Sequence, residues 1–378
     1  MKVLTVFGTR PEAIKMAPVV LELNRRPGIE SYVAVTGQHR QMLDQVLEIF
    51  KIKPDYDLNI FQPGQSLTDI SVRSMRGLEE IFKELKPDLL LVQGDTSTVF
   101  SGALSAFYHG VQIGHVEAGL RSHNLYSPYP EEANRKLTGV LANYHFAPTQ
   151  ANKDNLLKEG YKEEDIYVTG NTVIDALTYT EKEDYIFEEE VLNTLDFENK
   201  KIILLTCHRR ENIGEPMRRV FSAVRDIVLE DEEVEVVFPA HLNPLVREAA
   251  DEVFNGMDRV HKIEPLDYLP FSNLMMRSFL IVTDSGGIQE EAPYFGKPVL
   301  VVREETERWE GVEAGTAKLV GTNYNLLKSS LDDLLHNPES YKKMAHAINP
   351  YGDGKAAQRI VDIIESKGHM RKRVENGK

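Results

Sequence analysis

Short runs of β-branched and other apolar residues alternate with amphipathic helical patterns along almost the whole chain. This alternation is typical of parallel sheets whose strands are joined by helices and covered by them on both faces. The predicted strands cover residues 2–7, 31–36, 88–93, 111–115, 145–147, 201–206, 234–239, 260–263, 279–283 and 298–303. The sequence therefore predicts an α/β fold with one doubly wound parallel sheet in each half.

The length of 378 residues is enough for two domains that each bury a core. Residues 181–200 are strongly acidic without a clear period, which predicts a surface helix and loop between the halves. We predict an N-terminal domain at residues 1–170 and a C-terminal domain at residues 171–355. Residues 356–365 keep an amphipathic helical pattern.

Composition narrows the class of protein. No apolar run approaches the roughly 18 residues that a membrane span needs, and the apolar start is too short for a signal peptide. The net charge of -15 argues against broad nucleic-acid binding, which requires a basic surface. Cys207 is the only cysteine, which excludes an intrachain disulfide and favours a cytoplasmic location.

The segment DSGGIQEEAP at residues 284–293 follows the apolar strand 279–283 directly. Gly286 and Gly287 allow a ligand to approach the backbone closely, and the N–H groups of the helix that starts there favour an anion. Glu290 and Glu291 are placed to accept hydrogen bonds from ribose hydroxyls. The alternative is an ordinary strand-to-helix turn with solvated glutamates.

Another strand-to-helix turn follows residues 2–7. Thr9 and Glu12 fit a capping box, with Pro11 in the first helical turn. Arg10 and Lys15 then lie near a helix N-terminus, where two cations suit a diphosphate. Lys15 as a plain surface residue is the alternative.

Three carboxylates follow in the same half. Asp95 comes after strand 88–93, Glu117 after strand 111–115, and Glu131 shares a helix face with Arg135 through their four-residue offset. Because the carboxyl ends of parallel strands meet at one edge, these groups are expected to converge on one crevice. Two carboxyl groups with different pKa values can remove and return a proton. Taken singly, each could instead be a helix cap or a surface ion pair.

In the second half, His208 follows strand 201–206 beside two arginines, as expected for an acid or a phosphate ligand. A Cys207–His208 nucleophilic pair is disfavoured because neighbours on an extended segment point to opposite faces. His208 and His241 lack a close metal-ligand spacing, so no metal is predicted. Phe271 is a candidate for stacking on a nucleobase, with a core position as the alternative.

Several long motifs, in order, resemble those of the non-hydrolysing UDP-N-acetylglucosamine 2-epimerases of bacteria. They are FGTRPEAIKMAP at 7–18, QGDTST at 93–98, GHVEAGLRS at 114–122, CHRREN at 207–212, EPLDYLPF at 264–271, TDSGGIQEEAP at 283–293 and NPYGDG at 349–354. The resemblance implies a glycosyltransferase-B-type architecture, in which two Rossmann-like domains face a cleft and the C-terminal helix at 356–378 packs back onto the first. It also implies a cytoplasmic homodimer.

The resemblance further implies interconversion of UDP-N-acetylglucosamine and UDP-N-acetylmannosamine for cell-surface polysaccharide synthesis. In the family, UDP leaves by anti elimination to give 2-acetamidoglucal and then adds back, with neither a redox cofactor nor a metal. The family's catalytic positions fall on Asp95, Glu117, Glu131 and His208, with Lys15 assisting. Its substrate contacts fall on Arg10, Lys15, Asp95, Glu117, Arg135, His208, Leu266, Phe271, Ser285, Gly286, Gly287, Glu291 and Arg308. A second, regulatory site for the substrate is implied at Gln38, His39, Gln41, Arg209 and His241.

Three positions depart from the family pattern. Ser97 stands where many relatives continue a run of threonines, which is a mild change. Trp309 replaces a usual proline beside Arg308, and Gly64 stands where some regulated relatives have an arginine. A UDP-sugar-dependent glycosyltransferase of the same architecture and a non-catalytic UDP-sugar sensor remain as alternatives, since both would keep the turn at 284–293. The carboxylates Asp95, Glu117 and Glu131 favour the epimerase.

Overall fold

The computed structural model describes residues 1–37 and 40–375. The chain divides into two compact units, the first comprising Met1–Tyr179 with Tyr351–Lys378 and the second comprising Thr180–Pro350. Each unit is built around one parallel sheet. The predicted domain bounds, at 1–170 with 356–378 and at 171–355, stay a proposal about where independently folding domains begin and end.

The sheet of the first unit has the strand order β3-β2-β1-β4-β5-β6-β7. Its strands are β1 (Lys2–Phe7), β2 (Glu30–Val35), β3 (Tyr56–Asp57), β4 (Leu89–Gln93), β5 (Gln112–Val116), β6 (Tyr144–Ala147) and β7 (Ile166–Val168). The direction of winding reverses between β1 and β4, which pair in parallel. In open α/β sheets this reversal opens a crevice at the carboxyl ends of the strands, where ligands bind.

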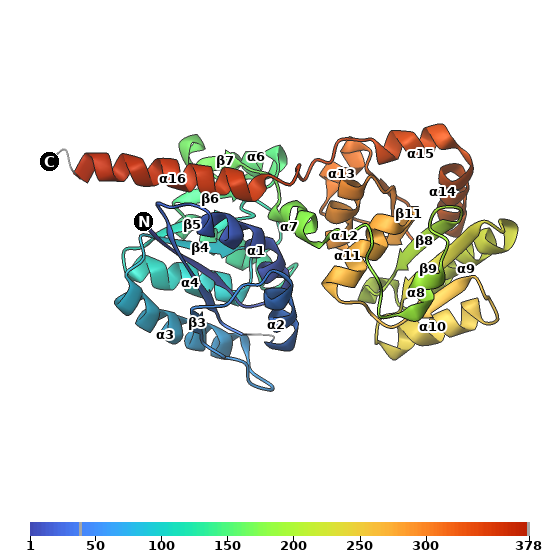
Figure 1. The fold of residues 1–378 in the computed structure, drawn as a ribbon, viewed down its shortest axis with the longest axis horizontal. Helices are drawn as coiled ribbons and strands as arrows, with labels where there is room; N and C mark the ends of the chain where they lie inside the picture. The colour runs from blue at the N-terminus through green and yellow to red at the C-terminus, as the bar shows by residue number, and fades with distance from the viewer. Residues whose placement is uncertain (38–39, 376–378) are drawn as a thin grey trace. The chain divides into compact units, whose positions relative to one another are not determined.

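Helices cover both faces of this sheet (Figure 1). They are α1 (Arg10–Asn24), α2 (Arg40–Ile49), α3 (Leu67–Leu85), α4 (Ser97–Tyr108), α5 (Glu131–Leu141), α6 (Gln150–Lys158), η1 (Glu163–Asp165), α7 (Thr172–Thr180) and α16 (Ala356–Glu375). The C-terminal helix α16 packs on α1 and buries Ile360, Val361 and Ile364. Arg26, just after the end of α1, also pairs with Asp362 of α16, at 2.7 Å.

The sheet of the second unit has the order β10-β9-β8-β11-β12-β13. Its strands are β8 (Lys201–Thr206), β9 (Val234–Pro239), β10 (Val260–Ile263), β11 (Leu280–Thr283), β12 (Val299–Val301) and β13 (Ala317–Leu319). Its helices are α8 (Glu190–Thr194), η2 (Arg210–Asn212), α9 (Glu215–Glu230), α10 (Pro244–Phe254), α11 (Tyr268–Arg277), α12 (Gly286–Glu291), η3 (Ala292–Phe295), α13 (Trp309–Ala314), α14 (Tyr324–His336) and α15 (Pro338–Ala345). Winding reverses between β8 and β11, which also pair in parallel.

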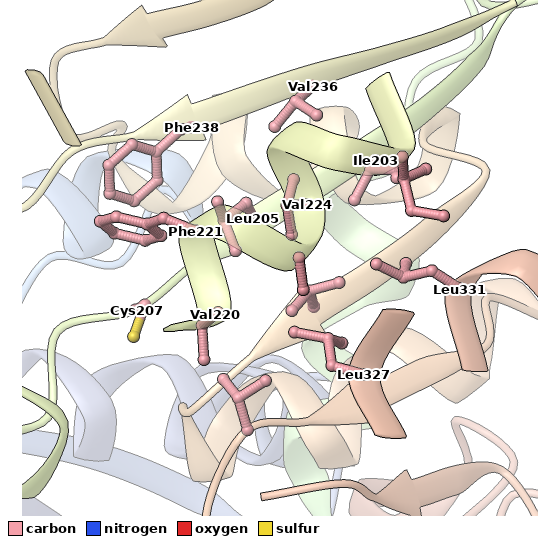
Figure 2. Packing of buried hydrophobic residues seen from close by; sticks show 14 of the residues in the cluster. Ile203, Leu205, Cys207, Val220, Phe221, Val224, Val236, Phe238, Leu327 and Leu331 are labelled. Atoms are coloured by element: carbon pink, nitrogen blue, oxygen red, sulfur yellow. The ribbon is translucent and has the colours of Figure 1, made fainter. Parts of the chain in front are cut away.

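One face of this second sheet carries a large apolar core. Figure 2 shows side chains of β8, β9 and α9 packed together, with Leu327 and Leu331 of α14 closing the cluster. Phe221 and Phe238 make an edge-to-face contact with ring centroids 5.3 Å apart. Cys207 belongs to this core and is buried, and burial raises its pKa well above the usual thiol range. The thiol is therefore core material rather than a nucleophile.

The sequence-based strands agree with the structure in both units. All ten predicted strands overlap an observed one, and 2–7, 201–206, 234–239 and 260–263 match to the residue. The strands β3, β7 and β13 were not predicted. They are edge strands of two or three residues, too short to show a hydrophobic period.

Candidate active site

Two carboxylates lie at the carboxyl edge of the first sheet. Asp95 follows β4 after Gly94, whose φ of 81° is one that glycine tolerates readily. Glu117 follows β5 directly and has a φ of 63°, which is uncommon for a residue with a side chain. His115 fixes the turn before Asp95 because its Nε2 donates to the carbonyl of Gly94 at 2.7 Å. Burial lowers the pKa of His115 to about 4, so the ring is neutral at physiological pH.

The carboxylate of Glu117 is held by three hydrogen-bond donors from different segments. Lys15 Nζ donates to Oε1 and Gln93 Nε2 donates to Oε2. Asn171 Nδ2 also donates to Oε1, at 3.2 Å. An ammonium and two amide donors stabilise the ionised form of a carboxyl group. The side chain is only 11% exposed, so these contacts are poorly screened by water.

Asp95 has a different environment. Arg135 donates from Nε to Oδ2 at 2.9 Å, and its Nη2 lies 2.7 Å from the same oxygen. Burial nevertheless raises the pKa of Asp95; Arg135 and Lys15 oppose this rise, while the nearby charges of Glu117 and Glu131 add to it. The pKa of Asp95 is therefore influenced by the charges of Glu117, Glu131, Lys15 and Arg135, which all lie nearby.

Glu131 begins α5 at the same edge. Among the side chains that the structure describes, its buried oxygen Oε2 has no hydrogen-bond partner. The next residue, Glu132, instead accepts from the N–H groups of Ser122 and His123 at 3.0 and 3.2 Å. Arg135 donates to Glu132 as well, at 3.1 Å. Glu132 therefore anchors the loop and Arg135, whereas Glu131 keeps an acceptor available for a ligand.

The N-terminus of α1 is capped as the sequence predicts. Glu12 Oε2 accepts from the N–H groups of Gly8 and Thr9 at 3.1 and 2.8 Å. This internal carboxylate occupies donors that could otherwise serve a bound anion. Arg10 is the first residue of the helix, and Lys15 points to Glu117 rather than to solvent.

In the second unit, Asp284 organises the end of β11. Its Oδ2 accepts from the backbone N–H groups of His208 and Arg209, each at 2.8 Å, and from Asn212 Nδ2 at 3.0 Å. His208 Nδ1 lies 3.3 Å from the other carboxylate oxygen. Burial lowers the pKa of His208, partly offset by the charge of Asp284. Asp284 thereby fixes the backbone that presents His208.

The glycine turn lies directly after Asp284. Ser285 is the N-cap of α12, and its N–H donates to Thr283 Oγ1 at 2.9 Å. The guanidinium of Arg308 covers Gly286 so closely that an added Cβ would lie 3.0 Å from its Cζ. At Gly287 an added Cβ would meet Glu291 Oε1 at 3.4 Å. The backbone of the turn, the guanidinium of Arg308 and the carboxylate of Glu291 therefore lie close together.

Arg308 is fixed despite the unusual Trp309 beside it. Its Nε donates to the buried Glu290 at 3.0 Å and its Nη1 to Glu307 at 3.1 Å. Trp309 begins α13 and is exposed. Phe271 is the residue predicted to stack on the nucleobase, and Leu266 is a predicted substrate contact. Both are half-buried and pack against the apolar core of this unit.

The structure describes only some of the residues predicted for a regulatory site. Gln38 and His39 lie outside the described residues. Gln41 is exposed in α2 of the first unit. In the second unit, His241 stacks on His208 with ring centroids 5.5 Å apart. Arg209 is the next residue after His208 in the chain.

The described part of the chain shows neither a cluster of metal-ligand side chains nor a helix suited to span a membrane. Residues 1–37 and 40–375 contain no group of three or more His, Cys, Asp or Glu side chains arranged to hold a metal ion. In the same part of the chain, none of the helices is long and apolar enough to cross a membrane.

Sequence reasoning missed several residues that shape these sites: Gln93, Glu132, Asn171 and Asp284 as a positioning group. Gln93, Asn171 and Asp284 lie at or just after strand ends. A search of all polar residues at the ends of the predicted strands, including the uncharged ones, would have found Gln93 and Asp284. Asn171 follows β7, which was not predicted. Glu132 had no such signal.

The fold and the two strand-end clusters define an α/β enzyme for an anionic, nucleotide-linked substrate. The family model described as UDP-N-acetylglucosamine 2-epimerase matches residues 21–365. The UDP-N-acetylglucosamine 2-epimerase of Bacillus subtilis (strain 168) is 59% identical over 364 residues, which cover 96% of this chain and 95% of that protein. The chain belongs to the UDP-N-acetylglucosamine 2-epimerase family, whose members are isomerases.

Solved structures agree with this assignment. The UDP-GlcNAc 2-epimerase of Neisseria meningitidis bound to UDP-GlcNAc aligns with a TM-score of 0.87 at 50% identity, covering 97% of this chain and 100% of that one. The enzyme of Methanocaldococcus jannaschii in complex with UDP-GlcNAc and UDP aligns with a TM-score of 0.76 at 34% identity, covering 97% and 100%.

Proposed function

We propose that this protein interconverts UDP-N-acetylglucosamine and UDP-N-acetylmannosamine by anti elimination of UDP to 2-acetamidoglucal and re-addition. The observation that carries the proposal is the contrast between Glu117, which accepts a hydrogen bond from the ammonium of Lys15, and Asp95, whose pKa is raised by burial. Carboxyl groups whose environments favour different protonation states can divide base and acid roles between them. The complex of the Neisseria meningitidis relative supports the substrate.

The C2–H bond of the sugar is not acidic by itself. Lengthening of the anomeric C–O bond places positive charge on the ring and makes loss of the C2 proton easier. We assign Glu117 as the base that takes this proton and Asp95 as the acid that returns one to the other face. Glu131 offers its buried Oε2 as an acceptor in the same site, and His208 assists departure of UDP.

UDP would be held at the glycine turn of the second unit. Ser285, Gly286 and Gly287 would contact the phosphates, with Arg308 supplying charge over Gly286. Glu291 would accept hydrogen bonds from the ribose hydroxyls. Leu266 and Phe271 would contact the base, and Arg10 and Arg135 would serve the substrate from the first unit.

The reaction is redox-neutral, because one proton leaves C2 and one returns while the C–O bond is broken and remade. No electron acceptor enters that balance, so we propose that no redox cofactor takes part. We propose that no metal takes part either, as the family resemblance implies. We also propose a cytoplasmic enzyme that supplies cell-surface polysaccharide synthesis, as the family resemblance implies.

Regulation by a second substrate molecule is proposed at Gln38, His39, Gln41, Arg209 and His241. The stacking of His241 on His208 supports it, because a ligand at His241 would directly touch a residue assigned to the active site. We expect sigmoidal dependence of the reverse reaction on substrate, lost in Gln41→Ala. Hyperbolic kinetics of the unaltered enzyme would refute the regulatory site.

We further propose a homodimer. Phe107 and Tyr108 of α4 and Leu137 and Val140 of α5 are exposed, and the two helices are neighbours. Adjacent large apolar side chains on a surface favour association with a partner. Sedimentation equilibrium should show a dimer, and Val140→Glu should weaken it; a monomer at all concentrations would contradict the proposal.

The function is tested by product analysis after incubation with UDP-N-acetylglucosamine alone. We expect UDP-N-acetylmannosamine at a fixed equilibrium ratio and no accumulation of free sugar. Free N-acetylmannosamine with UDP would indicate a hydrolysing enzyme. Conversion only after an acceptor is added would indicate a glycosyltransferase, and binding without conversion would indicate a sensor.

A further inference from the structure

Asn171 lies in the last segment of the first unit before the chain enters the second unit. It follows β7 and directly precedes α7, and the chain leaves the first unit after Tyr179. The chain returns to the first unit at Tyr351. The backbone N–H of Asn171 donates to the carbonyl of Tyr351 at 2.7 Å, so this residue joins the outgoing and returning segments.

The two segments are tied together by further contacts. The carboxylate of Asp175 accepts from the N–H groups of Ala356 and Ala357 at 3.1 and 2.8 Å. Gly170 and Gly352 touch backbone to backbone, since a Cβ on Gly352 would lie 3.4 Å from the Cα of Gly170. We call residues 169–175 and 351–359 the crossing clamp.

The side chain of Asn171 points out of the clamp and into the carboxylate cluster. Its Nδ2 donates to Glu117 Oε1 at 3.2 Å, while its Oδ1 accepts from the N–H of Val173 at 3.1 Å and caps the first turn of α7. Asn171 is buried, at 3% exposed. Both ends of one amide are therefore committed, one to local backbone and one to the proposed base.

The other two donors to Glu117 have different origins. Lys15 comes from helix α1, which follows β1, and Gln93 is the last residue of β4. Of these three donors, Asn171 is the one that belongs to the crossing clamp. Glu117 also has a positive φ, a backbone conformation that persists only where the surrounding structure holds it.

We propose that Asn171 is a positioning residue. Its amide holds the carboxylate of Glu117 in the orientation in which it takes the proton, and so ties Glu117 to the crossing clamp. The inference rests on the proposed epimerase function. A displacement of the returning segment would reach Glu117 through the side chain of Asn171.

The test uses Asn171→Asp and Asn171→Ala in the full-length enzyme, with turnover measured against pH. Asn171→Asp keeps the oxygen that caps α7 but replaces the donor by a second carboxylate oxygen beside Glu117. Two carboxyl groups that share a site raise the pKa of one of them. We expect kcat to fall about 10-fold to 100-fold and the acidic limb of the pH profile to move to higher pH. Asn171→Ala should move the limb the same way by less.

Asp353→Asn is the matched control in the crossing clamp. It weakens the ion pair between Asp353 and Arg359, at 2.7 Å, and leaves the contacts of Asn171 in place. We expect the wild-type pH profile for this variant. A fall in kcat without a pH shift in Asn171→Asp, or wild-type behaviour, would overturn the inference. An unaltered enzyme that converts no substrate would refute the proposed function instead.

Discussion

Arg135 contacts one oxygen of Asp95 through two nitrogens, with Nη2 at 2.7 Å and Nε at 2.9 Å from Oδ2. The same guanidinium donates to Glu132, which is fully buried and anchors the loop at Ser122. Arg135 therefore connects a carboxyl group proposed for catalysis to a fixed structural carboxylate. Burial raises the pKa of Asp95 and Arg135 opposes the rise.

Loss of this guanidinium should change the pH dependence of turnover. In Arg135→Gln the opposing charge is removed, so the pKa of Asp95 should rise further. If Asp95 returns the proton as an acid, the basic limb of kcat should move to higher pH while kcat itself falls. Arg135→Lys retains the charge and should show a smaller shift. A basic limb that stays in place would remove Asp95 from the acid role.

The two carboxyl groups themselves should be indispensable. We expect Asp95→Asn and Glu117→Gln each to lower turnover by at least ~10², as is usual when an acid or base is lost. Both variants nearly preserve side-chain shape, so circular dichroism and the thermal midpoint should show a folded protein. Rates near those of the unaltered enzyme would exclude the altered residue from the mechanism.

A side chain at Gly286 should disturb the glycine turn. In Gly286→Ala the new Cβ would lie 3.0 Å from Cζ of Arg308, so the guanidinium must shift from its place over the turn. We expect the Kd for UDP, measured by calorimetry, to rise about 10-fold. Gly28→Ala is a suitable control because an added Cβ there meets only Glu365, at 3.9 Å. Unchanged affinity in Gly286→Ala would argue against UDP at this turn.

Asp175 should make the stability of the protein depend on pH. Burial raises its pKa to about 6, although the N–H groups of Ala357 and Ala356 oppose the rise. A carboxyl group with a raised folded-state pKa contributes stability below its unfolded value near 3.8 and loses it as the pH rises through about 6. The unaltered protein should therefore lose up to about 3 kcal/mol relative to Asp175→Asn between these limits.

Urea titrations at roughly pH 4, 5.5 and 7.5, which span that window, measure the difference in the free energy of unfolding between the two proteins. The stability of Asp175→Asn relative to the unaltered protein should increase with pH. A constant difference would show that Asp175 does not titrate in this window.

Strand ends explain how much of the site could be predicted from the sequence. Asp95, Glu117 and His208 lie just after the ends of buried strands, and the rule that ligands bind at the carboxyl edge places them without any coordinates. The contact of Asn171 with Glu117 could not be foreseen, because it depends on β7, whose three residues give no periodic signal. The partner of Arg135 in its own helix was equally hidden, since Glu131 and Glu132 are both within helical reach and only the structure shows that Glu132 pairs with it.

The most direct measurement of the central claim is exchange at C2 of the sugar. The protein is incubated with UDP-N-acetylglucosamine in heavy water, and the C2 proton is followed by NMR as UDP-N-acetylmannosamine appears. Deuterium should enter C2 of both sugar nucleotides, and Glu117→Gln should slow its entry at least as much as turnover. Epimer formation with the C2 proton retained, or no exchange while the sugar nucleotide is bound, would contradict the account.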